Sequence, residues 1–206
     1  MWALLGIAVA AMHGEGVHAV PTVPTDADLV RAFQGGDVRA FDALFARYRQ
    51  PIFGYVYRSV GTASLAEELT QDVFLKVFQH LRRTGKDLSV RAWIYRIATT
   101  TCIDVHRAAT RRPALVDDEA ALLAAPGGID PAVWHLVRER RREVRVALDT
   151  LPAHYRQALI LRQLQGLSYA EIGEALGISV EAVTSLIHRA RHAFRTAYSR
   201  QQEKER

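Results

Sequence analysis

Two pairs of potential metal ligands stand four residues apart in segments with helical periodicity. Cys102 and His106 form one pair, and His188 and His192 form the other. Residues i and i+4 share one face of an α-helix, so each pair offers two ligands to a zinc ion. A structural zinc site takes four ligands, and the sequence has no CxxC or His-x3-Cys cluster to complete either pair. We therefore expect no metal site and no cofactor.

Catalytic chemistry would require a nucleophile, a base and a group that orients the base. The sequence has no recognisable set of this kind, no P-loop and no glycine-rich nucleotide motif. Asp104, beside Arg107 and Arg111, is explained by ion pairing along a helix. A hydrolase or nuclease using Asp, Glu and His is therefore not supported. We expect neither an enzyme nor a small-molecule substrate.

Nucleic-acid binding is the chemistry that the C-terminal part favours. "LSYAEIGEALGISVEAVTSLIHRARHAF", residues 167–194, contains a capping box made by Ser168 and Glu171. Gly177 is suited to end that first helix, and Ser179 can cap the next one. Two short helices joined by a tight glycine turn are typical of a helix-turn-helix, whose second helix enters the DNA major groove. An ordinary helical hairpin with a solvated basic face is the alternative.

The second of these helices has two distinct faces. Val183, Ile187, Ala190 and Phe194 follow the spacing of a buried stripe. The remaining face is polar and carries Glu181, Thr184, Ser185, His188, Arg191, His192 and Arg195.

Charge is unevenly distributed over the 206 residues. The formal net charge is +5, and the pI near 9.6 favours a polyanionic partner. Residues 26–112 and 138–200 each carry a net charge of +5, whereas residues 113–135 hold four acidic residues and no Lys or Arg. The single cysteine excludes an intramolecular disulfide and fits the reducing cytoplasm, which is the location we expect.

The N-terminal segment 1–25 is expected to be a disordered or mis-assigned leader. Its apolar start, "MWALLGIAVAAM", lacks the basic flank of a signal peptide and falls short of the ~20 residues that span a bilayer. A weak membrane-surface anchor is the alternative interpretation.

Helical periodicity extends from Asp26 almost to the C-terminus, and no strand pattern is present. Pro51 predicts a kink or break in a long amphipathic helix. Ser64 and Glu67 resemble a capping box at the start of a helix over 64–81, whose core stripe comprises Leu65, Leu69, Val73, Val77 and Leu81.

The fold class predicted from these patterns is all-α, with two helical domains joined by a flexible acidic linker, the second domain a helix-turn-helix. We expect the first domain at 26–112, the linker at 113–134, the second domain at 135–200 and a tail at 201–206. The linker "PALVDDEAALLAAPGGIDP" contains three prolines and a Gly-Gly pair.

Two separate motifs resemble bacterial sigma factors. "AEELTQDVFLKVF" followed by "RAWIYRIATTTCIDVHR" resembles their second conserved domain, and "LPAHYRQALILRQLQGLSYAEIGEALGISVEAVTSLIHRAR" resembles their fourth. A short chain with only these two domains resembles the extracytoplasmic-function class, group four of the sigma-70 family.

The resemblance implies core RNA polymerase as the main partner. It places the helix over 64–81 against the β′ clamp helices, with Glu68, Gln71 and Asp72 at the contacting positions. Acidic side chains on a basic domain suit docking to a basic partner, although they also complement the helix dipole. Leu159, Leu161 and Leu164 would serve a contact with the β flap, with core packing as the favoured alternative. An anti-sigma protein is a further partner of the class.

The resemblance also implies promoter DNA as a partner, with the minus-ten element read by the loop "RRTGKDLS" and the helix after it. Melted DNA needs stacking platforms and cations, and the loop would capture a flipped base. The corresponding positions here are Arg83, Lys86, Arg91, Trp93, Arg96, Thr100, Arg107 and Arg111, with Tyr95 and Arg112 of the same chemical types. Trp93 is equally suited to core packing. Thr100 stands where the family commonly has Asn.

The minus-thirty-five element would be read from the major groove. The matching positions are Glu181, Thr184, Ser185, His188, Arg189 and Arg191. Lys and Arg are common in the family where this chain has Thr184 and Leu186, so fewer phosphate contacts are expected. Gly173 replaces a frequent alanine.

The function these features predict is that of an alternative sigma factor, which binds core polymerase and directs promoter recognition and opening. A dimeric helix-turn-helix regulator that binds a palindrome without polymerase is the alternative. An acidic docking helix before an aromatic and basic helix argues against that alternative.

Overall fold

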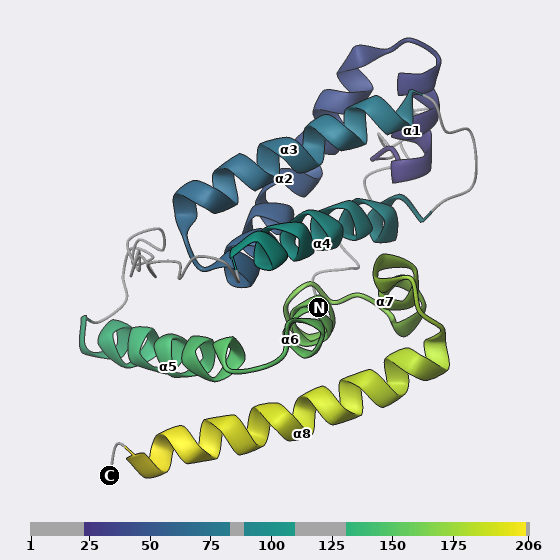
Figure 1. Ribbon diagram of the computed structural model, residues 1–206. Helices are drawn as coiled ribbons and strands as arrows, with labels where there is room; N and C mark the ends of the chain where they lie inside the picture. Colours follow the sequence, from purple (N-terminus) through teal and green to yellow (C-terminus); the bar gives the residue numbers. More distant parts are fainter. Residues whose placement is uncertain (1–22, 83–88, 110–130, 205–206) are drawn as a thin grey trace, which may run out of the picture.

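The computed structural model describes residues 23–82, 89–109 and 131–204, and every regular element in these ranges is helical (Figure 1). The first half of the chain contains α1 (Asp26–Gln34), α2 (Val38–Val60), α3 (Ala63–Leu81) and α4 (Val90–Ala109). The second half contains α5 (Pro131–Asp149), α6 (Ala153–Leu159), η2 (Ile160–Leu164), α7 (Tyr169–Leu176) and α8 (Val180–Lys204). The all-α prediction is confirmed.

Local sequence signals account for the helix ends of the first half. Thr25 and Asp28 form a capping box at the start of α1, and Asp37 caps α2. Gly61, at φ 88°, ends α2 in the left-handed conformation that glycine adopts without strain. Pro51 was predicted to kink or break its helix. It does not break the helix, and α2 is continuous from Val38 to Val60.

The capping box predicted at Ser64 and Glu67 is wrong. Helix α3 begins at Ala63, its N-cap is Thr62, and no side chain caps it. Ser64 therefore lies inside the first turn. The predicted core stripe is largely right, since Leu69, Val73, Val77 and Leu81 are buried and Leu65 is half-buried.

Aromatic rings and polar contacts hold α1–α4 together. Phe33 of α1, Phe41 of α2 and Phe78 of α3 lie with ring centroids 5.0–5.4 Å apart in tilted or edge-on geometry. Between α2 and α4, the buried Tyr55 and Thr99 hydroxyls share a 2.8 Å hydrogen bond. Burial raises the pKa of Tyr55 well above its usual range, so this phenol stays neutral.

The second half has boundaries slightly wider than the predicted domain. Helix α5 begins at Pro131, inside the predicted linker, because proline fits the first position of a helix, where no N–H is needed. Helix α8 continues to Lys204, into the predicted tail. The rest of the predicted linker and residues 1–22 of the leader lie outside the described residues. The domain boundaries remain a prediction.

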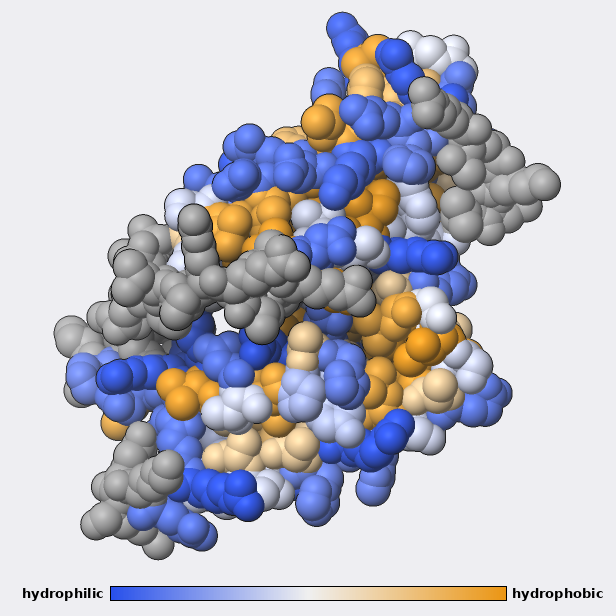
Figure 2. Space-filling model, in the orientation of Figure 1, coloured by the Kyte–Doolittle hydropathy of each residue, from blue (hydrophilic) through white to orange (hydrophobic). Residues whose placement is uncertain are grey.

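One apolar core extends through both halves. Tyr95 and Ile94 of α4 belong to the same buried cluster as Leu161, Leu167 and Ile172 of the second half. Figure 1 shows α4 lying between the α1–α3 bundle and the helices α6 and α7. On the face seen in Figure 2, hydrophobic side chains also reach the surface over α7 and the start of α8, where Ile178 and Val180 are exposed. None of the described helices is long and apolar enough to cross a membrane.

Candidate polymerase and DNA-binding surfaces

The helix-turn-helix forms as its residues predict. Ser168 accepts the Glu171 N–H at 3.2 Å, and Glu171 accepts the Ser168 N–H at 2.7 Å. Gly177, at φ 69°, ends α7 in the left-handed conformation. Ser179 then caps α8 by accepting the Ala182 N–H at 3.2 Å. The tight turn between these two caps fixes the direction in which α8 leaves α7.

Helix α8 separates a buried stripe from an exposed polar face. Val183, Ile187 and Ala190 are buried, and Phe194 is half-buried. All six residues predicted to meet the major groove are exposed: Glu181, Thr184, Ser185, His188, Arg189 and Arg191. The packing of α8 therefore presents these side chains together to solvent.

Some polar groups on this face already contact their own helix. The Thr184 hydroxyl donates to the Val180 carbonyl at 3.1 Å, and Arg189 Nε donates to the Ser185 carbonyl at 3.3 Å. The pKa of Glu181 is lowered by hydrogen bonds from its own backbone N–H and from Ser179, so it stays ionised at the helix N-terminus.

The predicted docking residues of α3 form an exposed polar face. Glu68, Gln71 and Asp72 are all exposed, on the opposite side from the buried Leu69 and Val73.

Leu75 continues this face of α3 and was not predicted from the sequence. Its side chain is 57% exposed, an unusual position for a leucine in a helix with a well-packed core stripe. Residues 68, 71, 72 and 75 follow the i, i+3, i+4, i+7 spacing of one helix face, and this spacing could have revealed the leucine. The combined surface is acidic with one aliphatic side chain.

The predicted minus-ten residues of α4 lie on two different faces. Arg96 and Thr100 are exposed, and the Thr100 hydroxyl donates to the Arg96 carbonyl at 3.0 Å. Trp93 is half-buried against the core, in edge-on contact with the His80 ring. Arg91 instead faces the second half of the chain, where it donates to the Gln165 carbonyl. The structure therefore separates Arg91 from Arg96 and Thr100.

Four predicted minus-ten residues have no described side chain. Arg83, Lys86 and Arg111 lie outside the described residues, and Arg107 belongs to α4 with only its backbone described.

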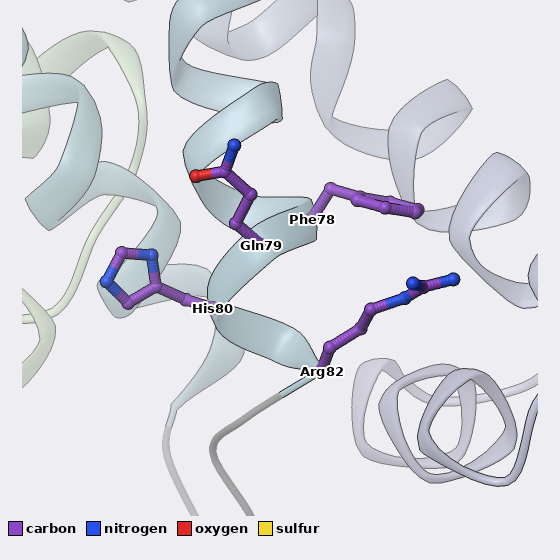
Figure 3. Close-up of a pocket in the computed structure, with 4 residues that line it drawn as sticks. All are labelled: Phe78, Gln79, His80 and Arg82. Atoms are coloured by element: carbon purple, nitrogen blue, oxygen red, sulfur yellow. The ribbon is translucent and has the colours of Figure 1, made fainter.

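A surface pocket of about 270 Å³ lies at the C-terminal end of α3 (Figure 3). Phe78, Gln79, His80 and Arg82 line it. The Arg82 guanidinium lies 4.9 Å from the centroid of the Phe78 ring, and His80 projects on the other side of the helix end (Figure 3). An aromatic ring beside a cation is a suitable surface for a stacked base.

Two regions of the chain match family models. Residues 44–112 match Sigma-70 region 2, and residues 141–193 match Sigma-70, region 4. The RNA polymerase sigma-H factor of Pseudomonas aeruginosa is 34% identical over 179 residues, which cover 84% of this chain and 93% of that protein. The ECF RNA polymerase sigma-E factor of Escherichia coli is 34% identical over 82% of this chain and 92% of its own length. The chain belongs to the extracytoplasmic-function class of the sigma-70 family.

Two solved structures have a similar fold. CnrH, in complex with the cytosolic domain of CnrY, is 26% identical with a TM-score of 0.61, over 83% of this chain and 95% of that one. The sigma factor RpoE of Bartonella quintana, in complex with the anti-sigma factor NepR, shares the fold at 21% identity and a TM-score of 0.60, over 79% of this chain and 98% of that one.

The described potential metal ligands of the sigma factor are not brought together into one site. Cys102 is fully buried, and burial raises the pKa of its thiol to about 12, which disfavours the thiolate that a metal would need. His188 and His192 are exposed on α8. Among the residues that the structure describes, no three His, Cys, Asp or Glu side chains are placed to hold a metal ion.

Proposed function

We propose that the chain acts as an alternative sigma factor, which binds core RNA polymerase and directs promoter recognition and opening. The acidic face of α3 carries the proposal, because docking to a basic partner calls for such a face and DNA binding alone does not. Glu68, Gln71 and Asp72 are exposed together on the first half of the chain, which is otherwise basic.

The partner of that face is the basic pair of clamp helices on the polymerase β′ subunit. Electrostatic complementarity would steer the encounter, and Leu75 would add apolar burial at the C-terminal end of the contact. Of the three leucines considered for the β flap, Leu159 and Leu161 are buried, and Leu164 is 51% exposed. A flap contact therefore rests on Leu164.

The minus-ten element would be opened and read along the outer face of α4 and at the pocket beside it. Arg96 would contact the backbone, and Thr100 would offer its hydroxyl oxygen as an acceptor. Phe78 and Arg82 would help hold a flipped base, together with Arg83 and Lys86 of the adjoining loop. Arg107 and Arg111 follow in the sequence and would add cations for the DNA backbone.

The minus-thirty-five element would be read by α8 in the major groove. Its exposed face has two arginines among the six proposed contacts, so phosphate binding would be modest and salt-sensitive. His188, Ser185 and Thr184 are of a size to reach base edges.

The proposed sigma factor performs no covalent chemistry, because the polymerase supplies the catalytic site. It needs no cofactor or small-molecule substrate, and its work with polymerase would be in the cytoplasm. An anti-sigma protein is proposed as a further partner. The structure of the similar chain CnrH with the cytosolic domain of CnrY supports a protein partner of this kind.

Run-off transcription tests the proposal. Purified core polymerase is incubated with and without this protein on a pool of genomic promoter fragments. Transcripts that require the protein support a sigma factor, and their start sites define both promoter elements. If no transcripts appear and the protein alone shifts duplex DNA at moderate salt, the dimeric-regulator alternative replaces it.

A further inference from the structure

Two arginines from different helices lie at the C-terminal end of α2. The Arg58 guanidinium of α2 donates to the Gly54 carbonyl at 2.7 Å. The Arg145 guanidinium of α5 donates to the Gly61 carbonyl at 3.5 Å. The C-terminal end of a helix attracts cations, but its dipole is equivalent to only about half a negative charge. The helix end therefore neutralises a minor part of the positive charge held beside it.

A third arginine, Arg141, adds to this positive charge. Arg141 and Arg145 are one turn apart on α5, so they share one face of that helix. Burial and the neighbouring guanidiniums of Arg141 and Arg145 lower the pKa of Arg58, because each of these effects disfavours its charged form. Arg58, Arg141 and Arg145 are named the arginine cluster below.

The arginine cluster is short of carboxylates. The ion pairs found among the described residues include neither Arg58 nor Arg145. Asp149 is the acidic group at this end of α2, and it pairs at 3.4 Å with Arg156, which also donates to the Ser59 carbonyl. The nearby carboxylate thus has a cation of its own. Like charges held together in this way favour the binding of an anion.

An anion can reach the cluster, and aromatic rings lie beside it. Arg58 and Arg141 are exposed, and Arg145 is half-buried. The Arg145 guanidinium lies 4.5 Å from the centroid of the Tyr57 ring. The half-buried rings of Phe53 and Tyr57 are nearly parallel, with an interplanar angle of 11° and centroids 6.1 Å apart. The site therefore combines cations with an aromatic surface.

Phosphate is the anion that this chemistry fits best. The planar guanidinium fork matches phosphate oxygens in a bidentate manner. A terminal phosphate carries nearly two negative charges at neutral pH, whereas a carboxylate carries one. Several guanidiniums at one helix end suit several linked phosphates. Duplex DNA presents its phosphates in long rows and calls for cations spread along a face, not cations that converge on one point from two helices.

We propose that the arginine cluster binds a triphosphate group. Inorganic tripolyphosphate and a nucleoside triphosphate share this chemistry. A nucleotide would also place its base against the rings of Phe53 and Tyr57, because aromatic rings are platforms for bases. The inference goes beyond the proposed function and does not depend on it.

Calorimetric titration of the full chain tests the proposal. Sodium tripolyphosphate and ATP are titrated separately without Mg²⁺, which would neutralise part of their charge. Arg58→Gln with Arg145→Gln removes two cations of the cluster. Arg39→Gln with Arg200→Gln is the matched control, which removes the same charge at exposed positions near the start of α2 and near the end of α8. Circular dichroism checks that both variants keep their helices.

The unsubstituted and control chains should bind tripolyphosphate with the same affinity to within about twofold. The cluster variant should bind at least about tenfold more weakly, because it loses charge-assisted hydrogen bonds. Arg58→Lys with Arg145→Lys should have an intermediate affinity, since lysine keeps the charge and lacks the fork. This graded loss separates anion binding from a purely structural role of the two arginines.

The two ligands distinguish the sources of the triphosphate. ATP that binds more tightly than tripolyphosphate, with the difference lost in Phe53→Leu, would identify a nucleotide. Equal affinities would identify the phosphates alone as the ligand.

Three results would overturn the proposal. The first is no measurable binding of either ligand to the unsubstituted chain. The second is equal weakening in the cluster variant and the control, which would show diffuse attraction to a basic protein. The third is unchanged tripolyphosphate affinity in the cluster variant together with weaker binding to duplex DNA, which would make the cluster a DNA-binding surface. No titration contains polymerase, so failure of this site is distinguishable from failure of the sigma role, which run-off transcription tests.

Discussion

Gly173 shows how one missing methyl group sets the geometry of the helix-turn-helix. A Cβ at this position would lie 2.8 Å from the carbonyl oxygen of Ile178, in the turn that leads into α8. The Ile178 N–H in turn donates to the Gly173 carbonyl at 3.0 Å. The turn therefore packs directly on the backbone of α7, which explains why this chain has glycine where the family often has alanine.

We expect Gly173→Ala to destabilise the second half and weaken minus-thirty-five binding. Alanine gains ~1 kcal/mol of helix propensity, but displacing a packed backbone costs about 1–3 kcal/mol. Thermal unfolding should show a midpoint lower by a few degrees. Gly54→Ala is the control, because the atom its Cβ would meet at 2.8 Å is the movable end of the Arg58 side chain. An unchanged midpoint for Gly173→Ala would show that the turn can move at no cost.

Leu75 is an exposed apolar residue within a polar face, which gives it a specific expected role. Leu75→Gln should leave the unfolding free energy nearly unchanged and reduce affinity for core polymerase several-fold, because an apolar contact is lost. Binding of labelled protein to core polymerase measures this. Val38→Gln, at a similarly exposed position on α2, should leave affinity unchanged. Equal affinity of the Leu75→Gln and Val38→Gln variants for core polymerase would show that Leu75 is not part of the docking surface.

Helix α3 has one face that packs in the core and one exposed face that we propose as the polymerase-docking surface. Glu68→Arg with Asp72→Arg should abolish polymerase binding and preserve the helical fold, since both carboxylates are exposed and the clamp is basic. Circular dichroism and a polymerase pull-down measure the two effects. Asp42→Arg with Glu139→Arg makes the same charge change at exposed positions elsewhere. Unchanged affinity in the α3 variant would refute this docking face.

On the exposed face of α8, Thr184 is an uncharged residue that can be replaced by a cation. Thr184→Lys should strengthen binding of the reconstituted polymerase to its promoter and steepen the log–log salt dependence by about one unit, because one phosphate contact is added. Thr196→Lys lies three turns further along the same helix and should change neither quantity. A salt dependence unaltered by Thr184→Lys would place this face of α8 away from the DNA backbone.

At the scale of the whole molecule, a shared core predicts cooperative unfolding. Since the buried cluster runs from α1 to α8, calorimetry of the free chain should show one transition with equal calorimetric and van't Hoff enthalpies. Substituting Tyr95→Phe and Glu171→Gln together removes the Tyr95–Gln165 hydrogen bond and the Arg91–Glu171 ion pair between the halves, and should split or broaden that transition. Two separate transitions in the unsubstituted chain would show that the halves behave as independent domains.

The sequence by itself determined what depends on neighbours along the chain. The caps at Ser168 and Ser179, the end of α7 at Gly177 and the buried stripe of α8 are local patterns, and all were predicted. The polar face of α8 lies opposite that stripe, so its exposure could be predicted from the same spacing. The acidic positions of α3 were predicted from the resemblance to sigma factors, and all three are exposed.

Tertiary structure decided what depends on residues far apart in the chain. The contact of Arg91 with Gln165 joins residues 74 positions apart, and no periodicity within α4 distinguishes a cation that meets DNA from one that meets another helix. The exposure of Leu75 and the absence of room at Gly173 likewise depend on which helix packs where. The chemistry of each side chain follows from the sequence, but the packing of the helices determines which residue that side chain contacts.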